Sequence, residues 1–248
     1  MAGDRIVTVD DSLFVGKKVT NERAMRTLKG PKGSQVKLGV KRMGEKDLLS
    51  FTITRGDIPQ NTVDAAYMLN DEIGYVKVSK FGRTSHVELL NALAQLNHKK
   101  CKGLIIDLRG NTGGYMEAAI RMVNEFLPEG KLIVYTQGRK YPRAEEFANG
   151  TGSCQKMPLV VLIDEGSASA SEIFTGAIQD NDRGTVVGRR SFGKGLVQVP
   201  RSLPYGGTMK VTTSKYYIPS GRCVQAIDYK HRNEDGSCLL YTSDAADE

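Results

Sequence analysis

The first part of the chain alternates apolar and polar residues. Ile6–Asp10, Gln35–Lys41 and Leu49–Thr54 each show the two-residue period of a half-buried strand. Asn21–Leu28 has the spacing of a short helix, and its first residue, Asn21, is a candidate N-cap. This strand–helix–strand–strand unit ends near residue 57 and holds too few strands to close a core alone.

After residue 57 the pattern changes to apolar strands separated by helices. Gly103–Asp107 and Pro158–Asp164 are unbroken apolar runs, typical of strands buried on both faces, and His86–Leu96 has its leucines on one helical face. This alternation favours an α/β domain with a largely parallel sheet over residues 58–230. The other predicted elements are strands at Gly74–Ser79, Lys131–Tyr135, Thr185–Val187, Leu196–Val199, Met209–Thr213 and Tyr216–Ile218, and helices from Met116 to Phe126 and ending near Gln179.

The composition is that of a soluble globular protein. The 248 residues are 40% hydrophobic and 25% charged, which suits one large domain or two smaller ones. The net charge is +7, but the basic residues are scattered, so we expect no nucleic-acid partner. The four cysteines and three histidines do not cluster, which argues against a zinc site, and we expect no metal and no cofactor.

No run of about 18 apolar residues is present, so the sequence predicts no transmembrane segment, and we find no signal peptide. Residues 231–248 are expected to form a non-native or disordered tail. Within it, residues 238–248 resemble a translated sequencing adapter and are left out of the fold prediction.

The first segment with candidate chemistry is the Gly/Ser/Ala turn from Asp164 to Ile173. It follows a buried strand and enters a helix, so a serine there lies at the carboxyl end of the strand, beside unpaired helix N–H groups. That arrangement suits a nucleophile next to an oxyanion hole. However, Ser169 and Glu172 also form the Ser-x-x-Glu pattern of a capping box, and on this segment alone the capping interpretation is preferred.

A glycine-rich segment from Gly188 to Gln198 supplies a candidate base. It nearly matches a Walker A loop, but Gly195 occupies the position of the Mg²⁺-binding hydroxyl and a strand follows, so we expect no nucleotide. A serine nucleophile needs a base, and a lysine serves when desolvation lowers its pKa. Lys194 could take this role, with Gln198 orienting it from the same face of a strand. The alternative is a glycine turn with a solvated lysine.

A third turn, Asp107–Gly114, follows the other buried strand. Its paired glycines, Gly113 and Gly114, could supply a second backbone N–H to an oxyanion. A simple tight turn explains the segment equally well.

Together the three segments resemble the C-terminal processing peptidases, also called tail-specific proteases. That family is recognised by the ordered motifs L-R-x-N-x-G-G, S-A-S-A-S-E and F-G-K-G-x-V-Q, which this chain has at Leu108–Gly114, Ser167–Glu172 and Phe192–Gln198. Tyr216–Arg222 also resembles the family. Three motifs in the expected order outweigh the capping interpretation.

The resemblance implies a serine endopeptidase with a Ser–Lys dyad that acts on polypeptides near their C-terminus by acyl transfer. Ser169 would be the nucleophile, Lys194 the base and Gln198 its orienting residue. The N–H groups of Ala170 and of one paired glycine, with Gly114 preferred, would form the oxyanion hole.

The resemblance also implies a fold and a setting. Residues 58–230 would be a crotonase-like (ClpP/crotonase) peptidase core, and residues 1–57 the C-terminal part of a truncated PDZ domain. The parent protein could be a homodimer, and the family's bacterial members are exported to the cell envelope or periplasm. Cys223 departs from the family, which more often has an aliphatic residue there.

Three alternatives stay open. The chain could be a non-catalytic protein of the same family that binds peptides through its PDZ domain, or an inactive fragment. It could also be a crotonase-like acyl-CoA enzyme, because that fold shares an oxyanion hole built from two N–H groups. The Ser–Lys pair and the PDZ-like unit argue against the last alternative.

Overall fold

A computed structural model describes residues 3–16, 19–56, 61–98, 100–236 and 238–240. The chain divides into two units, Met1–Gln60 (unit 1) and Asn61–Glu248 (unit 2). The boundary that the sequence places near residue 57 falls in a segment outside the described residues.

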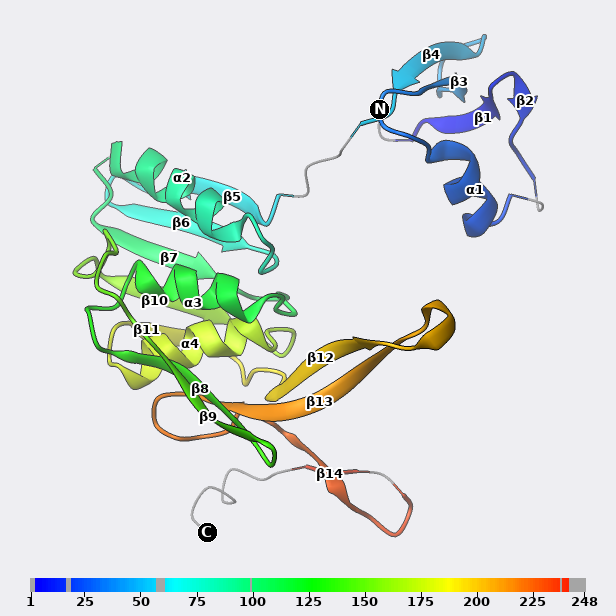
Figure 1. Cartoon of the computed structure of the whole chain (residues 1–248). Helices are drawn as coiled ribbons and strands as arrows, with labels where there is room; N and C mark the ends of the chain where they lie inside the picture. The colour runs from blue at the N-terminus through cyan, green and yellow to red at the C-terminus, as the bar shows by residue number, and fades with distance from the viewer. Residues whose placement is uncertain (1–2, 17–18, 57–60, 99, 237, 241–248) are drawn as a thin grey trace. The chain divides into compact units, whose positions relative to one another are not determined.

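Unit 1 is a small antiparallel sheet with one helix (Figure 1). The strand order is β2-β1-β3-β4, and the side chains of Val9, Phe14, Val36, Leu38 and Val40 form its core. The sequence predicted too few strands for a separate core, but the short strand β2 adds a fourth. All three strands and the helix expected from the sequence are present. The elements are β1 (Arg5–Val9), β2 (Ser12–Leu13), α1 (Asn21–Leu28), β3 (Gln35–Lys41) and β4 (Leu49–Thr54).

The cap of α1 differs from the sequence prediction by one residue. Thr20, not Asn21, is the N-cap, with an extended backbone and a side-chain oxygen that accepts a hydrogen bond from the Arg23 N–H at 3.2 Å. Both residue types cap helices well, so composition could not separate the two neighbours.

Unit 2 is built on a five-stranded sheet in the order β11-β10-β7-β6-β5. All neighbours are parallel except β5 and β6, which confirms the largely parallel sheet that the apolar runs predicted. The strands are β5 (Val63–Met68), β6 (Ile73–Val78), β7 (Gly103–Asp107), β10 (Leu159–Ile163) and β11 (Thr185–Gly188), and the helices are α2 (Ser85–His98), α3 (Met116–Asn124) and α4 (Ala170–Asp180).

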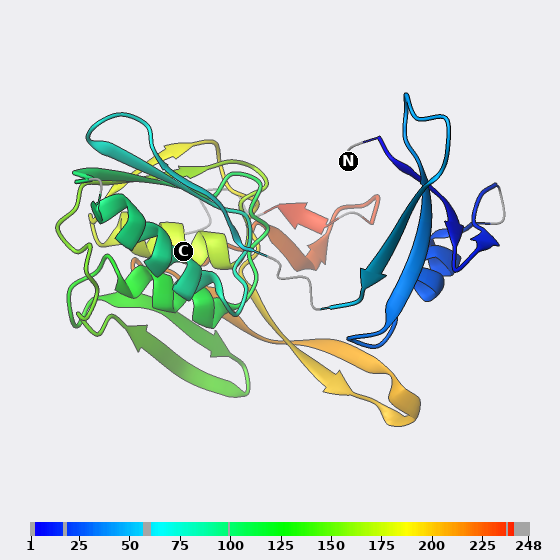
Figure 2. The ribbon, with the colours of Figure 1, turned by 90° about the horizontal axis from the view of Figure 1, so that it is seen from above.

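A second sheet covers the other side of the helices. Its order is β12-β13-β8-β9, all antiparallel, and Figure 2 shows the helices lying between the five-stranded sheet and strands β8 and β9. Helix α4 is therefore covered on both sides, and every residue from Ala170 to Ile178 is buried. The strands are β8 (Leu132–Gly138), β9 (Tyr141–Phe147), β12 (Leu196–Ser202) and β13 (Thr208–Tyr217).

The β12–β13 pair forms a long ribbon, with a short 3₁₀ turn at Pro204–Gly206 (Figure 1). The sequence predicted two strands where β13 is one, because Thr212–Lys215 is a polar stretch with little alternation. Farther on, β14 (Ile227–Arg232), which begins before the expected tail of residues 231–248, pairs with β15 (Cys238–Leu240), which lies within it, and residues 241–248 lie outside the described part. Across the described residues, no helix is long and apolar enough to cross a membrane.

Candidate active site

Ser169 lies at the junction of β10 and α4 in an unusual backbone conformation. Its φ is 58° and its ψ is −115°, whereas an ordinary N-cap residue is extended. A non-glycine residue held there stores strain of about 1–3 kcal/mol, and such strain concentrates at functional sites. Ser169 is partly exposed, while its neighbours Ala168 and Ala170 are buried. Of the segment Ala168–Ala170, the structure therefore exposes the side chain of Ser169.

Hydrogen bonds of Asn111 connect the turn that holds Ser169 to the glycine turn, Asp107–Gly114. The carbonyl oxygen of Asn111 accepts hydrogen bonds from the Ala168 N–H at 3.0 Å and the Ser171 hydroxyl at 2.8 Å. Its side-chain oxygen accepts from the Gly113 N–H at 2.8 Å, and its amide nitrogen donates to the carbonyl of Val78. Because Asn111 is fully buried, one residue holds both turns against β6.

Gly113 and Gly114 have positive φ angles and lie too close to neighbouring atoms for a side chain, so both positions require glycine. Gly113 has φ 94°, and a Cβ there would lie 2.8 Å from the Cβ of Ser169; Gly114 has φ 149°, and a Cβ there would lie 2.1 Å from the carbonyl oxygen of Phe81. The N–H of Gly113 is taken by Asn111. The bridge between Phe81 and Gly114 uses the N–H groups of Phe81 and Tyr115. This leaves the Gly114 N–H as the candidate donor to a ligand.

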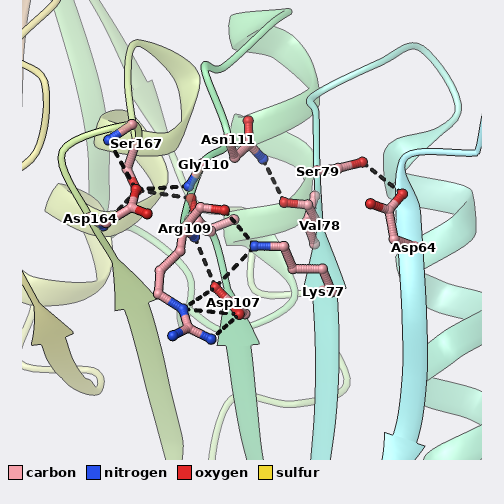
Figure 3. A network of polar contacts seen from close by, with 12 residues as sticks. Asp64, Lys77, Val78, Ser79, Asp107, Arg109, Gly110, Asn111, Asp164 and Ser167 are labelled. Atoms are coloured by element: carbon pink, nitrogen blue, oxygen red, sulfur yellow. Dashed lines mark hydrogen bonds and ion pairs between the residues drawn. The ribbon is translucent and has the colours of Figure 1, made fainter.

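A buried charge network supports the glycine turn from β7 (Figure 3). The Asp107 carboxylate accepts hydrogen bonds from Tyr75 at 2.6 Å and from the Arg109 guanidinium at 2.7 Å, and Lys77 lies 3.2 Å away. Burial alone would raise the pKa of Asp107, but hydrogen bonds from Arg109 and Tyr75 outweigh it and hold that pKa well below its ordinary value. Burial and the bond to Asp107 raise the pKa of Tyr75 to about 12.

Asp164 joins the ends of β7 and β10 in the same view (Figure 3). Its Oδ1 accepts from the N–H groups of Gly110 at 2.7 Å and Gly166 at 3.0 Å. The bond from Gly110, ahead of the other contacts, lowers the pKa of Asp164. The Ser167 hydroxyl donates to the carbonyl of Leu108 at 2.8 Å, so Ser167 is a structural residue of the turn.

The lysine segment is tied to the serine turn through Glu172. The Glu172 carboxylate accepts hydrogen bonds from the N–H groups of Ser169, Gly193 and Lys194 at 2.7–2.9 Å, and from the Ser191 hydroxyl at 2.7 Å. The Glu172 part of the predicted capping box is therefore present, and the same carboxylate also holds the lysine loop. Strand β12, not a helix, follows this loop, as expected for a segment that is not a Walker A motif.

Four of the predicted site residues line one pocket of about 310 Å³: Gly114, Ser169, Lys194 and Gln198. Ala170 is not among the lining residues, but it is the first residue of α4, so its N–H has no acceptor within the helix. The full lining is Gly114, Tyr115, Met116, Ser169, Ile173, Lys194, Leu196, Val197, Gln198, Pro200, Lys210 and Tyr216.

The structure corrects two steps of the argument from sequence. Lys194 precedes β12, and the pairing of β12 with β13 shifts between Val197 and Gln198, so Lys194 and Gln198 do not share a face of one regular strand. Both side chains are exposed, whereas the argument for a lysine base assumed burial. The two residues reach the same pocket because the loop and the bulge turn them there.

Sequence reasoning missed two residues at this site. Tyr216 belongs to a segment that resembles the family, but no role at the site was assigned to it. It lines the pocket and contacts both the serine and the lysine segments, and a tyrosine in a predicted strand does not indicate such contacts. Lys210 is a second lysine in the pocket, placed there by the pairing of β13 with β12. Among the described residues, no group of His, Cys, Asp and Glu converges in a way that could hold a metal ion.

Comparison with known proteins places this site in a family. The model of peptidase family S41 matches residues 72–231, which include every candidate catalytic residue. The carboxy-terminal-processing protease of Bartonella bacilliformis is 37% identical over 232 residues, covering 92% of this chain and 52% of the relative. The carboxyl-terminal-processing protease of Synechocystis is 39% identical over 221 residues, covering 87% of this chain and 50% of the relative. The chain belongs to peptidase family S41, and it spans about half the length of these curated relatives.

Solved structures agree on the fold. The photosystem II D1 C-terminal processing protease superposes with a TM-score of 0.61 at 29% identity, covering 90% of this chain and 61% of that protein. An S41 protease from Bacteroides fragilis gives a TM-score of 0.58 at 17% identity, covering 89% and 62% of the two chains. The mixed α/β fold of this chain is therefore that of S41 proteases.

Proposed function

We propose that this chain carries the catalytic core of a serine endopeptidase of the C-terminal processing type, with Ser169 as nucleophile and Lys194 as base. One observation carries the proposal. Ser169 is held with a positive φ at a strand–helix junction and lines the same pocket as Lys194, Gln198 and Gly114. The names of the relatives support the C-terminal processing type.

The proposed reaction is acyl transfer. The Ser169 Oγ attacks the carbonyl carbon of the scissile peptide while its proton passes to the amine of Lys194. Lys194 then gives the proton to the leaving amine, the peptide C–N bond breaks, and an ester to Ser169 is left. Water, activated by the same amine, hydrolyses the ester and frees Ser169. Gln198 orients the Lys194 amine through its side-chain oxygen.

The oxyanion of the tetrahedral intermediate would be held by two N–H groups. The Ala170 N–H is the first of α4, where the helix dipole favours negative charge, and the Gly114 N–H is the paired-glycine donor that Asn111 does not occupy.

Lys194 is exposed in the free chain, so we propose that the substrate itself supplies the desolvation. A polypeptide seated in the pocket displaces water around the amine and favours its neutral form. We further propose that unit 1 is part of a peptide-binding PDZ domain. The parent protein would act in the bacterial cell envelope on polypeptides recognised by their C-terminal segment.

The test is cleavage of an unstructured polypeptide with a free C-terminus, followed by mass spectrometry, together with labelling of Ser169 by a fluorophosphonate. We expect Ser169→Ala to abolish labelling and cleavage. We expect Lys194→Ala to lower kcat by about 100- to 10,000-fold, as loss of a general base does.

Lys210→Ala is the matched comparison, because Lys210 is the other lysine of the pocket. It should keep kcat near the wild-type value. If Lys210→Ala abolished labelling while Lys194→Ala did not, the base would be misassigned. If the wild-type chain neither cleaved nor took the label, the proposal of an active core would fail.

A further inference from the structure

The side chains of Glu172 and Tyr216 both contact the backbone of Ser169 and Lys194. Glu172 accepts from their N–H groups, and Tyr216 lies against their carbonyl oxygens. The buried Glu172 carboxylate accepts from the N–H of Ser169 at 2.7 Å and the N–H of Lys194 at 2.9 Å, both through Oε2. The Tyr216 hydroxyl lies within hydrogen-bond distance of the Ser169 carbonyl oxygen, at 3.1 Å, and of the Lys194 carbonyl oxygen. Two buried side chains therefore bracket the two candidate catalytic residues.

Each oxygen of the Glu172 carboxylate accepts two hydrogen bonds. The other oxygen of Glu172, Oε1, accepts from the Gly193 N–H and the Ser191 hydroxyl, both at 2.7 Å. Hydrogen bonds from N–H groups to a carboxylate are short and strong, and a buried carboxylate left without them is costly. The Lys194 loop is thus held against the first turn of α4, where Glu172 is the third residue.

Tyr216 can donate to the carbonyl oxygens of Ser169 and Lys194 only while its hydroxyl is protonated. Tyr216 is 2% exposed, and burial, reinforced by the nearby Glu172 charge, raises the pKa of its hydroxyl far above the ordinary value. At neutral pH the hydroxyl therefore keeps its proton, which the carbonyl oxygens of Ser169 and Lys194 share.

We propose that Glu172 and Tyr216 form a clasp that sets the separation of Ser169 and Lys194, and that both are positioning residues for proton transfer between them. The clasp acts on backbone groups and leaves both reactive side chains free. It also explains how an exposed lysine at the end of a loop keeps a fixed place, because the loop is anchored at Lys194 itself. The inference rests on the proposed function.

The first test is Tyr216→Phe, which removes the hydroxyl and keeps the buried ring. We expect kcat to fall by about tenfold or more, as small displacements of catalytic groups produce, with KM close to the wild-type value. Tyr217→Phe, the next residue of β13 with its ring stacked on Tyr135, is the matched control and should leave kcat unchanged. Wild-type kcat in Tyr216→Phe would overturn the proposal.

The second test does not depend on catalysis. In Glu172→Gln an amide N–H₂ replaces one acceptor oxygen, so amide hydrogen exchange should accelerate at Ser169, Gly193 and Lys194 while other amides of unit 2 keep their protection. Glu88→Gln is the control. Glu88 accepts from the N–H groups of Thr62 and Val63, so this variant should accelerate amide hydrogen exchange at those two residues and not at Ser169, Gly193 or Lys194.

The two tests separate the clasp from the proposed function. Unchanged exchange at Ser169 and Lys194 in Glu172→Gln would overturn the clasp, even in an active enzyme. If the wild-type chain showed no turnover, the peptidase proposal would fail, yet faster exchange confined to these amides would still support the clasp.

Discussion

The two units differ in how deeply they bury their helices. In unit 1, the helix α1 has no buried residue and packs on five buried apolar side chains through Ala24 and Leu28, which are themselves partly exposed. In unit 2, the helix α4 is buried from Ala170 to Ile178 and belongs to a core several times larger, shared by two sheets. The strained Ser169 sits on the helix with the deeper packing.

This difference indicates what a strained site needs. A positive φ at a serine costs about 1–3 kcal/mol and persists only where the surroundings fix it. Around Ser169 they do, because Asn111, Glu172 and Tyr216 hold the turn by hydrogen bonds and α4 cannot shift within its core. We therefore expect unit 2 to unfold at a higher temperature than unit 1, in a separate transition.

The largest expected effect comes from Phe174→Ala in the core of unit 2. Phe174 is fully buried and its ring contacts those of Phe81 and Phe126, at 6.3 and 5.9 Å between centroids. Removing a buried phenylalanine ring costs about 3–5 kcal/mol. Urea unfolding, followed by hydrogen exchange on peptides from each unit, should show the loss in unit 2 alone.

Phe147→Ala is the control for this prediction, because Phe147 lies on β9 of the same unit and is 49% exposed. It should change the free energy of unfolding by less than about 1 kcal/mol. Equal losses in both units after Phe174→Ala would mean that the two units unfold as one, and the comparison would fail.

A smaller and pH-dependent effect is expected for Asp107→Asn. The substitution leaves Arg109 and Lys77 without their carboxylate, and because Arg109 is half exposed we expect the low end of the cost of breaking a buried ion pair, about 3 kcal/mol. The folded state holds the pKa of Asp107 below its unfolded value of about 3.9. Its stabilisation is therefore complete above the unfolded value and is lost progressively as the pH falls below it towards the folded-state pKa.

The measurement is the free energy of unfolding of unit 2 between pH 6 and pH 3. The wild-type protein should lose stability with falling pH more steeply than Asp107→Asn. Asp64→Asn is the control, because Asp64 is exposed and its carboxylate accepts a hydrogen bond from Ser79 at 2.8 Å (Figure 3). If the free energy of unfolding had the same pH dependence in the wild-type protein and in Asp107→Asn, the ionised Asp107 carboxylate would not stabilise unit 2 as we predict.

The sequence predicted the fold best where burial is one-sided or complete. The limits of β3 and β7 agree with the prediction, because alternation and unbroken apolar runs are direct consequences of burial. Two of the strands that it missed, β5 and β9, carry neither signal. In β9 all seven residues are exposed and one is a proline, and β5 has two adjacent alanines in place of an alternation.

For the site, the order of the motifs selected four residues that line one pocket, but it did not explain their geometry. The capping-box pattern pointed to Glu172, yet its bonds to Gly193 and Lys194 cross 21 and 22 residues of chain, which no local pattern encodes. The sequence did not predict that the Lys194 side chain is exposed, because the neighbouring glycines are compatible with a buried lysine as well as with an exposed one. Roles for Ser169, Lys194 and Gln198 remain predictions.

The smallest expected effect is Thr20→Ala in unit 1. Thr20 is the N-cap of α1, and its hydroxyl accepts the Arg23 N–H at 3.2 Å. Loss of an N-cap costs about 1 kcal/mol. Because the core of unit 1 is small, this loss should lower the melting temperature of unit 1 measurably and leave the transition of unit 2 in place.

Asn21→Ala separates the observed cap from its neighbour. Asn21 lies inside α1, where alanine is the better helix former, so this variant should be as stable as the wild-type protein or slightly more stable. Thr20→Ser, which keeps the hydroxyl, should retain most of the stability of unit 1. The opposite ranking, with Asn21→Ala the more damaging variant, would place the helix start one residue later and show that unit 1 relies on that cap instead.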